Sequence, residues 1–410
     1  MLKLDLIHTV ALAGLFLFIG HGIRRLIPLL ARYNVPAPVL GGLLAAIIIL
    51  LARQQGVELV QFDATLQSPL MTAFFTSIGF GASLSLLRIG GPQVIVFLLI
   101  STVVATAQNL LGGLLAVGLG IHPLFGVLAG SVTLTGGPAT GLAFAPLFEQ
   151  AGVPAAASVA VAAAMVGIIS GGLIGGPLGT YIIERYRLRT ARVKTMHLDL
   201  PAAANIVEDQ MPEQPVSIPE GEDEESYIIL KNLVALMLAM WVGSWVGAWF
   251  ASVGITLPAY IGAMLVASVF RNFDDVTKLI GLSQRALDDI GSVALSLFIT
   301  MAIMTLRLWE LTGLALPLLT LLASQVVLVV AVSVWMVYRL MGRDYDAAVM
   351  SSGFCGFMLG ITANAMANME ALAEKYGTAP RAFLVVPIVG AFFIDFTNAL
   401  IITLFLNLWR

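Results

Sequence analysis

The sequence predicts an all-α membrane protein with ten transmembrane helices, and its composition is the first reason. Of its 410 residues, 59% are hydrophobic and 11% are charged, whereas a soluble domain is about one quarter charged. Its apolar runs are long enough to cross a bilayer, which takes about 20 residues, and they lack the alternation of barrel strands. A net charge of −3 gives no indication of a nucleic-acid partner, and a single cysteine excludes an intrachain disulfide.

The second observation is the distribution of the apolar runs along the chain. We expect spans at 5–22, 37–52, 69–87, 92–118, 156–183, 227–253, 256–270, 288–306, 314–338 and 382–407. Two further apolar stretches, 122–146 and 346–369, are interrupted by Gly, Ser, Thr and Asn. These two stretches are predicted to be re-entrant hairpins, which enter the membrane and return to the same side.

The third observation is the position of the basic residues. With the N-terminus outside and both hairpins returning, all but four of the 21 Lys and Arg residues lie inside, where basic loop residues concentrate. The four exceptions are Lys3, Arg53, Arg307 and Arg410. A full crossing by either hairpin would weaken this bias. The charges therefore predict that the N-terminus, and after ten crossings also the C-terminus, lies outside.

The chain divides into a first repeat at 1–184, a linker at 185–226 and a second repeat at 227–410. The linker begins basic, ends acidic and contains several prolines, which is typical of a mobile cytoplasmic tether. Regulation through it is the alternative reading.

The two halves match in order and spacing. PVLGG at 38–42 corresponds to PAYIG at 258–262, and Gln108 corresponds to Gln325. Five crossings per half is an odd number, so the second copy enters from the opposite side. Such inverted repeats are typical of transporters with alternating access to a site near the bilayer midplane. A duplicated membrane scaffold without transport is the alternative.

The glycine-rich hairpin tips are the candidate substrate site. Backbone N–H and C=O groups left free there require partners, and a bound ion or substrate supplies them. The alternative is that small residues only allow close helix packing. The predicted substrate-binding residues are Thr135, Gly136, Gly137, Thr140, Gly141, Ser352, Gly353, Thr362 and Asn364.

Asp395 is the strongest candidate for a cation site. It lies deep in the last predicted span, where an unpaired carboxylate costs about 2.5–3.5 kcal/mol. Oxygen ligands suit a hard cation such as Na⁺, so we expect Asn398, Ser170, Cys355 and Gly356 to complete the site. An interhelical salt bridge, a capping role and a protonated, proton-coupling Asp395 remain as alternatives.

Other functional classes have little support in the sequence. It contains no G-x-x-x-x-G-K-[ST] loop, so we do not expect an ATP-driven pump, and it contains no hydrolase motif. We expect no enzymatic activity and no cofactor besides Na⁺ as the coupling ion.

Several stretches together resemble one family. They include PAPVLGGLLAA, GVLAGSVTLTGGPATG, LSLFITMAIMTLRLWEL and FLVVPIVGAFFIDFTNALI. From about residue 30 to the C-terminus, the linker excepted, the chain is similar to the bacterial sodium/glutamate symporters. The resemblance implies Na⁺-driven uptake of L-glutamate across the bacterial inner membrane, with periplasmic termini and a cytoplasmic linker. It also implies a homodimer in which a transport domain moves against a fixed scaffold, as in an elevator.

The chain departs from this family at the hairpin tips. The first tip reads Gly136-Gly137-Pro138-Ala139, where the family typically has Gly-Gly-X-Gly, and the second continues with Asn364. These departures fall at the expected substrate contacts. They leave another small dicarboxylate or amino acid, carried with Na⁺ or H⁺, as the alternative substrate.

Overall fold

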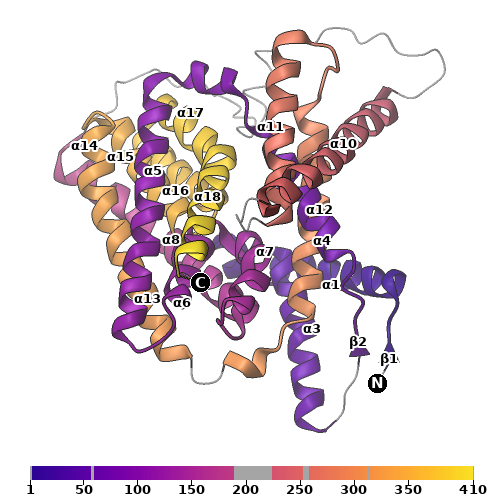
Figure 1. Ribbon diagram of the computed structural model, residues 1–410. Coiled ribbons are helices and arrows are strands. Elements are labelled where there is room, and N and C mark those ends of the chain that lie inside the picture. Colours follow the sequence, from indigo (N-terminus) through magenta and orange to yellow (C-terminus); the bar gives the residue numbers. More distant parts are fainter. Residues whose placement is uncertain (1, 57–59, 189–223, 253–257, 312–313, 410) are drawn as a thin grey trace.

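The helices pack into two groups, and each group combines elements from both halves of the chain (Figure 1). The computed structural model describes residues 2–56, 60–188, 224–252, 258–311 and 314–409. The predicted linker 185–226 therefore lies almost wholly outside the described residues.

The first group consists of the helices on the right of Figure 1, where α4 lies against α11 and α12, and α1 lies against α3 and α12. Its members are α1 (Leu6–Leu26), α3 (Ala37–Gln54), α4 (Gln67–Gly81), α10 (Glu224–Ser252), α11 (Ala259–Thr277) and α12 (Gln284–Met304). The short α2 (Pro28–Arg32) joins α1 to α3, and two-residue strands β1 (Leu2–Lys3) and β2 (Val60–Gln61) pair in parallel.

The second group carries both predicted hairpins. The first hairpin is α6 (Pro123–Val127), the π-helix η1 (Leu128–Val132) and α7 (Gly137–Gln150), and the second is α15 (Tyr345–Met358) and α16 (Thr362–Tyr376). Around them lie α5 (Leu84–Gly118), α8 (Ala156–Arg185), α13 (Ala315–Val332), η3 (Ser333–Val337), α14 (Tyr338–Leu340), α17 (Pro380–Ile388), η4 (Val389–Phe393) and α18 (Ile394–Trp409). The 3₁₀ turn η2 (Leu308–Leu311) leads from the first group to α13.

Local sequence explains where several of these helices begin. Asp5 accepts a hydrogen bond from the His8 N–H and so caps α1, and Ser283 and Asp344 cap α12 and α15 in the same way. Proline at the first helical positions, as in α2 and α17, fits because no intrahelical bond is lost there.

Glycines allow the closest helix approaches. A Cβ at Gly126 of α6 would overlap the carbonyl oxygen of Gly112 of α5, and a Cβ at Gly262 would overlap that of Gly243. The glycine-rich composition therefore supports packing at these crossings, as is common for helices in lipid.

Two predicted spans are interrupted. The predicted span 69–87 is broken between α4, which ends at Gly81, and α5, which begins at Leu84. The further break at Gly91, with φ of 65° and ψ of −165°, falls between the predicted spans 69–87 and 92–118, where the sequence placed a boundary. The last span is divided into α17, η4 and α18, and the π-helical turn η4 ends at Phe393, two residues before Asp395. Sequence periodicity did not reveal the breaks inside these two spans, because they depend on tertiary contacts; π turns are frequent at functional sites.

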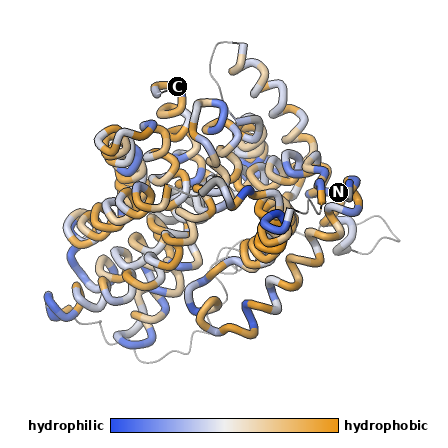
Figure 2. The backbone as a smooth tube through the Cα atoms, turned by 90° about the horizontal axis from the view of Figure 1, so that it is seen from below, coloured by the Kyte–Doolittle hydropathy of each residue, from blue (hydrophilic) through white to orange (hydrophobic). Residues whose placement is uncertain are grey.

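Among the described residues, seven helices are long and apolar enough to cross a membrane. They are α1, α3, α8, α10, α12, the part of α5 from Gly91 onward, and the run from α13 through α14. Apolar colouring follows most of the helices in Figure 2. The predicted class, a helical membrane protein, is therefore confirmed.

The two groups meet through apolar side chains. Ala139 and Leu142 of α7 belong to one buried cluster with Val39 of α3 and with Phe298 and Ile299 of α12. The first hairpin therefore rests on helices of the first group.

Candidate functional site

The tips of the two hairpins meet. Gly137, the first residue of α7, has a φ of 66°, which favours glycine. A Cβ at this position would lie 3.2 Å from Cγ2 of Ile361 and 3.9 Å from the carbonyl oxygen of Gly360. Since Gly360 and Ile361 join α15 to α16, the glycine allows the backbones of the two tips to approach closely.

A fully buried glutamine connects the same two tips. The Thr135 hydroxyl donates to Oε1 of Gln108 at 2.9 Å, and Gln108 Nε2 donates to the Met358 carbonyl at 3.2 Å. Gln325 of α13 donates from Nε2 to the Gln108 carbonyl at 2.8 Å. The repeat-related glutamines are thus in contact at the centre of the second group.

A second polar cluster surrounds Ser131. Gly130 leaves helical geometry with φ −100° and ψ −130°, which frees the backbone of the next residue. The Ser131 N–H donates to Asn109 Oδ1 at 3.0 Å, and the Ser131 carbonyl accepts from Asn398 Nδ2 at 3.0 Å. These two bonds fix the orientation of both amides.

The remaining atoms of this cluster are unsatisfied. Among the described residues, Asn109 Nδ2, Asn398 Oδ1 and Ser131 Oγ are buried and have no hydrogen-bond partner. An unmade buried hydrogen bond costs about 1–3 kcal/mol, so the cluster is suited to bind a small polar guest. Two free oxygens and one free amide N–H₂ are available to it.

The second hairpin binds the backbone of α8 and η4. Asn364 Nδ2 donates to the Ile168 carbonyl at 2.6 Å, and Asn368 Nδ2 donates to the Gly171 carbonyl at 3.0 Å. Thr362 Oγ1 donates to the Gly390 carbonyl at 2.7 Å. Asn364 Oδ1 is also buried, without a hydrogen-bond partner in the described part of the chain.

Four of the predicted substrate residues make packing contacts. A Cβ at Gly141 would lie 2.9 Å from Cβ of Ala160, and one at Gly353 would lie 2.5 Å from Met369 Sδ. Gly136 packs on Thr140 in the same manner.

Ser352 lies away from the tips. Its hydroxyl donates to the Gly175 carbonyl at 2.7 Å, which ties α15 to α8. This bond satisfies the Ser352 hydroxyl within the protein.

Asp395 lies in the first turn of α18 and is half-buried. Among the described residues, no basic side chain forms an ion pair with it. The phenol of Tyr260 is within electrostatic range of its carboxyl group. Tyr260 is buried between Phe75, at a ring distance of 3.9 Å, and Phe144, and no described residue bonds to its hydroxyl.

The other residues predicted for the cation site have different neighbours. Cys355 is buried with its thiol beside Ser333 of η3, and a Cβ at Gly356 would contact Ala365 and Asn368 of α16. Ser170 is half-buried on α8. Among the predicted cation ligands, Asn398 is therefore hydrogen-bonded to Ser131. Cys355 and Gly356 instead contact residues of η3 and α16.

Sequence reasoning missed several polar residues of this region: Asn109, Ser131, Asn368, Tyr260 and the contacts of Gln108. The available signal was an uncharged polar residue inside an apolar run, as in TAQNLLGG for Gln108 and Asn109. Tyr260 carried no such signal, because a tyrosine near the start of the predicted span 256–270 is typical of the membrane interface.

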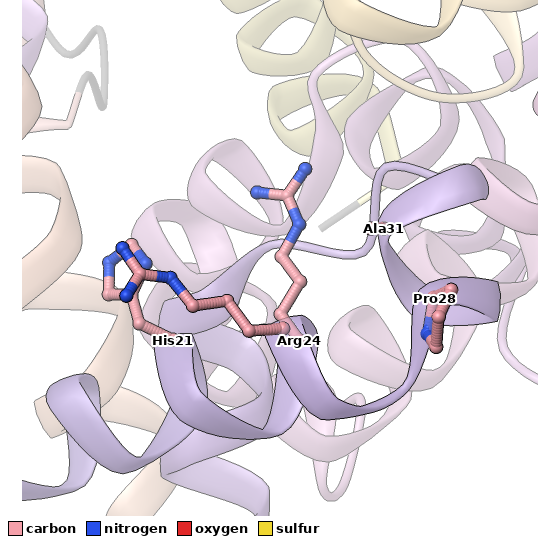
Figure 3. Close-up of a pocket in the computed structure, with 5 residues that line it drawn as sticks. His21, Arg24, Pro28 and Ala31 are labelled. Carbon is pink, nitrogen blue, oxygen red and sulfur yellow. The ribbon is translucent and has the colours of Figure 1, made fainter.

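A separate pocket lies at the junction of α1 and α2. It is lined by His21, Arg24, Arg25, Pro28 and Ala31 (Figure 3). None of the predicted site residues lines this pocket, and most of its side chains are exposed.

Comparison with known proteins identifies the family. The model of the sodium/glutamate symporter family matches residues 2–378. The chain is 38% identical over 410 residues to a sodium/glutamate symporter of Escherichia coli (strain K12), covering 100% of this chain and 99% of the relative. It is 37% identical over 400 residues to one of Haemophilus influenzae, covering 96% and 95% of the two chains.

The apolar helices and the broken segments at a shared polar centre define an integral membrane protein of the transporter class. The chain belongs to the sodium/glutamate symporter family. The family resemblance stated from the sequence is therefore confirmed.

Proposed function

We propose that this chain is a secondary transporter that carries L-glutamate across the membrane together with Na⁺, and that it has no enzymatic activity. The observation that carries the proposal is the meeting of two hairpin tips beside buried polar atoms without partners, in a member of this family. Relatives named as sodium/glutamate symporters, aligned over nearly their whole length, support the choice of ion and substrate.

The substrate binds at the hairpin tips in this proposal. The helices α7 and α16 both begin there, at Gly137 and Thr362, and helix N-termini present N–H groups to carboxylates. Thr135 and Asn364 supply the polar side chains, and the free Oδ1 of Asn364 suits the substrate ammonium group. The other predicted residues, Gly136, Thr140, Gly141, Ser352 and Gly353, shape the tips through packing.

Na⁺ binds beside Ser131 in this proposal. Asn398 Oδ1 and Ser131 Oγ are free oxygens of two residues joined by a hydrogen bond, and hard cations prefer such ligands. Asp395 lies three residues before Asn398 on the same helix and contributes negative charge to the site. The lack of a described basic partner for Asp395 supports a bound cation as its counter-charge.

The wider architecture follows the same proposal. Ten spans in two inverted repeats, at 1–184 and 227–410, surround the hairpins, with periplasmic termini and a cytoplasmic linker at 185–226. The group that carries the hairpins is the moving domain of an elevator, and the group of α1, α3, α4 and α10–α12 is the scaffold of a homodimer. Among the described elements, α7 packs on α12 through apolar side chains where the groups meet, and an apolar contact of this kind supports a sliding movement.

Uptake by the purified protein in liposomes tests this function. Labelled L-glutamate should accumulate under an inward Na⁺ gradient and should fail to accumulate when choline replaces Na⁺. Uptake that is indifferent to Na⁺ but follows a pH gradient would favour a proton-coupled carrier. No uptake of any acid in a competition panel would favour a non-transporting scaffold.

A further inference from the structure

We infer that Gln108 is a positioning residue that holds the tips of the two hairpins together, so that the site forms and moves as one unit. The inference rests on the proposed function, because it concerns the site at these tips. The role of Gln108 is separate from ligand binding, because in this inference Gln108 contacts neither the substrate nor Na⁺.

The two halves of the Gln108 amide contact different hairpins. Oε1 accepts from Thr135, which precedes the tip glycines of the first hairpin, and Nε2 donates to Met358, which ends α15 of the second. The side chain is fully buried, and both ends of its amide are satisfied. One residue of α5 thus connects segments that lie more than 200 residues apart in sequence, as the separation of 223 between Thr135 and Met358 shows.

The Met358 carbonyl and the Thr135 hydroxyl both lie at helix ends, where the backbone supplies fewer hydrogen-bond partners. The last carbonyls of an α-helix lack intrahelical donors, and Met358 is the last residue of α15. Thr135 lies in the turn between η1 and α7, where the chain has left helical geometry. Loss of the amide would leave the Met358 carbonyl without this donor, and it would leave the Thr135 hydroxyl with only a weak acceptor, Met358 Sδ at 3.8 Å.

Gln325 provides a matched comparison. It occupies the corresponding position of the second repeat, is fully buried, and has an amide of the same size. Within the described part of the chain, its hydrogen bond goes to the main chain of Gln108, and it bonds to neither tip. A general packing role predicts similar effects at both glutamines, whereas the positioning role predicts an effect at Gln108 alone.

The physical consequence is coupling between the tips. With Gln108 present, the Gly137 backbone stays close to the Ile361 side chain, and the two tips enclose the region between the hairpins. Without Gln108, the tips separate more readily. Bringing them together then costs free energy, which weakens the binding of the substrate. Separation also opens a path for Na⁺ that does not require glutamate.

Gln108→Met and Gln325→Met test the inference, because methionine keeps the volume and removes the hydrogen bonds. The purified variants are reconstituted in liposomes, and the KM for glutamate and the uptake of ²²Na⁺ without glutamate are measured. Two lost hydrogen bonds should raise the KM of Gln108→Met by roughly tenfold or more and produce a ²²Na⁺ leak. Gln325→Met should keep the KM within about twofold and show no leak, since the hydrogen bond that it removes goes to the Gln108 main chain and to neither tip.

A double-mutant cycle supplies the second readout. Thr135→Val removes the same link from the other side, together with the polar contact that Thr135 offers the substrate. Adding Gln108→Met to it should therefore raise the KM much less than Gln108→Met raises the KM of the wild type, which is a strongly non-additive result. Where Gln108→Met does not fold, Gln108→Asn is compared with Gln325→Asn, because asparagine keeps an amide that is too short to reach both tips.

Equal KM shifts at both glutamines, or full additivity with Thr135→Val, would overturn the inference. Failure of the proposed function is distinguishable, because the wild-type protein would then show no Na⁺-dependent glutamate uptake.

Discussion

Replacing Asp395 by asparagine removes a negative charge while keeping the shape of the side chain. The residue is half-buried at the start of α18, and no described basic residue forms an ion pair with it. If Na⁺ binds at Asn398 and Ser131, this carboxylate is its nearest negative charge among the proposed ligands. The expected result is weaker Na⁺ binding with little change in the maximal transport rate at saturating Na⁺.

The magnitude follows from Coulomb's law. A unit charge 4–8 Å from Na⁺ contributes roughly 2–4 kcal/mol at an effective dielectric constant of about 20. Partial exposure of Asp395 reduces this contribution to about 1.5–3 kcal/mol through solvent screening. Since about 1.4 kcal/mol corresponds to a tenfold change, the half-saturating Na⁺ concentration should rise by roughly ten- to a hundredfold.

The assay is the initial rate of glutamate uptake in liposomes as a function of Na⁺ concentration. The thermal stabilisation of the purified protein by Na⁺ gives an independent measure of binding. Asp289→Asn is the matched control, because it makes the same charge change on an exposed side chain of α12 and should leave both curves in place.

An unchanged Na⁺ activation curve for Asp395→Asn would refute the assignment of the cation. If Asp395 instead carries a coupling proton, the substitution should change the pH profile of uptake and leave the Na⁺ curve in place. The two measurements therefore separate the two roles.

Two further predictions concern stability. Asp346→Ala removes the carboxylate that accepts from the first N–H groups of α17 at 3.0 and 3.2 Å, so the free energy of unfolding should fall by about 1–3 kcal/mol. A lower Tm in detergent with an unchanged glutamate KM is expected, and a changed KM with an unchanged Tm would contradict it. Gly126→Ala should destabilise the crossing of α5 and α6, because its Cβ would overlap backbone atoms, whereas Gly118→Ala meets open space in α5 and should be neutral or stabilising. Equal Tm values for these two variants would argue against the close approach.

The sequence anticipated most of the elements and part of the site. Apolar runs predicted helices because a helix in lipid satisfies its backbone internally, and α1, α3, α8 and α13 lie where those runs lie. The glycine-rich stretch around Gly137 predicted a tip where the chain turns, and the structure has a break between η1 and α7 there.

The sequence did not reveal which polar atoms are left without partners. Asn398 was predicted as a cation ligand from its spacing to Asp395, yet its hydrogen bond to Ser131 joins residues 267 positions apart. The same holds for Asn109, whose amide is oriented by the backbone of Ser131. Contacts of this kind depend on how helices from the two halves pack, and a single sequence carries no direct record of them.

By itself, the sequence determined the membrane class, the helical segments and the family resemblance, because hydrophobic length and local glycine content are properties of the chain alone. Only the tertiary structure decided that each group of helices draws on both halves, and that the hairpin tips meet around Gln108. The physical reason is that a buried hydrogen bond forms only between groups that packing brings within about 3 Å of each other. That proximity is fixed by the whole fold, including glycine-mediated crossings such as the one at Gly112 and Gly126.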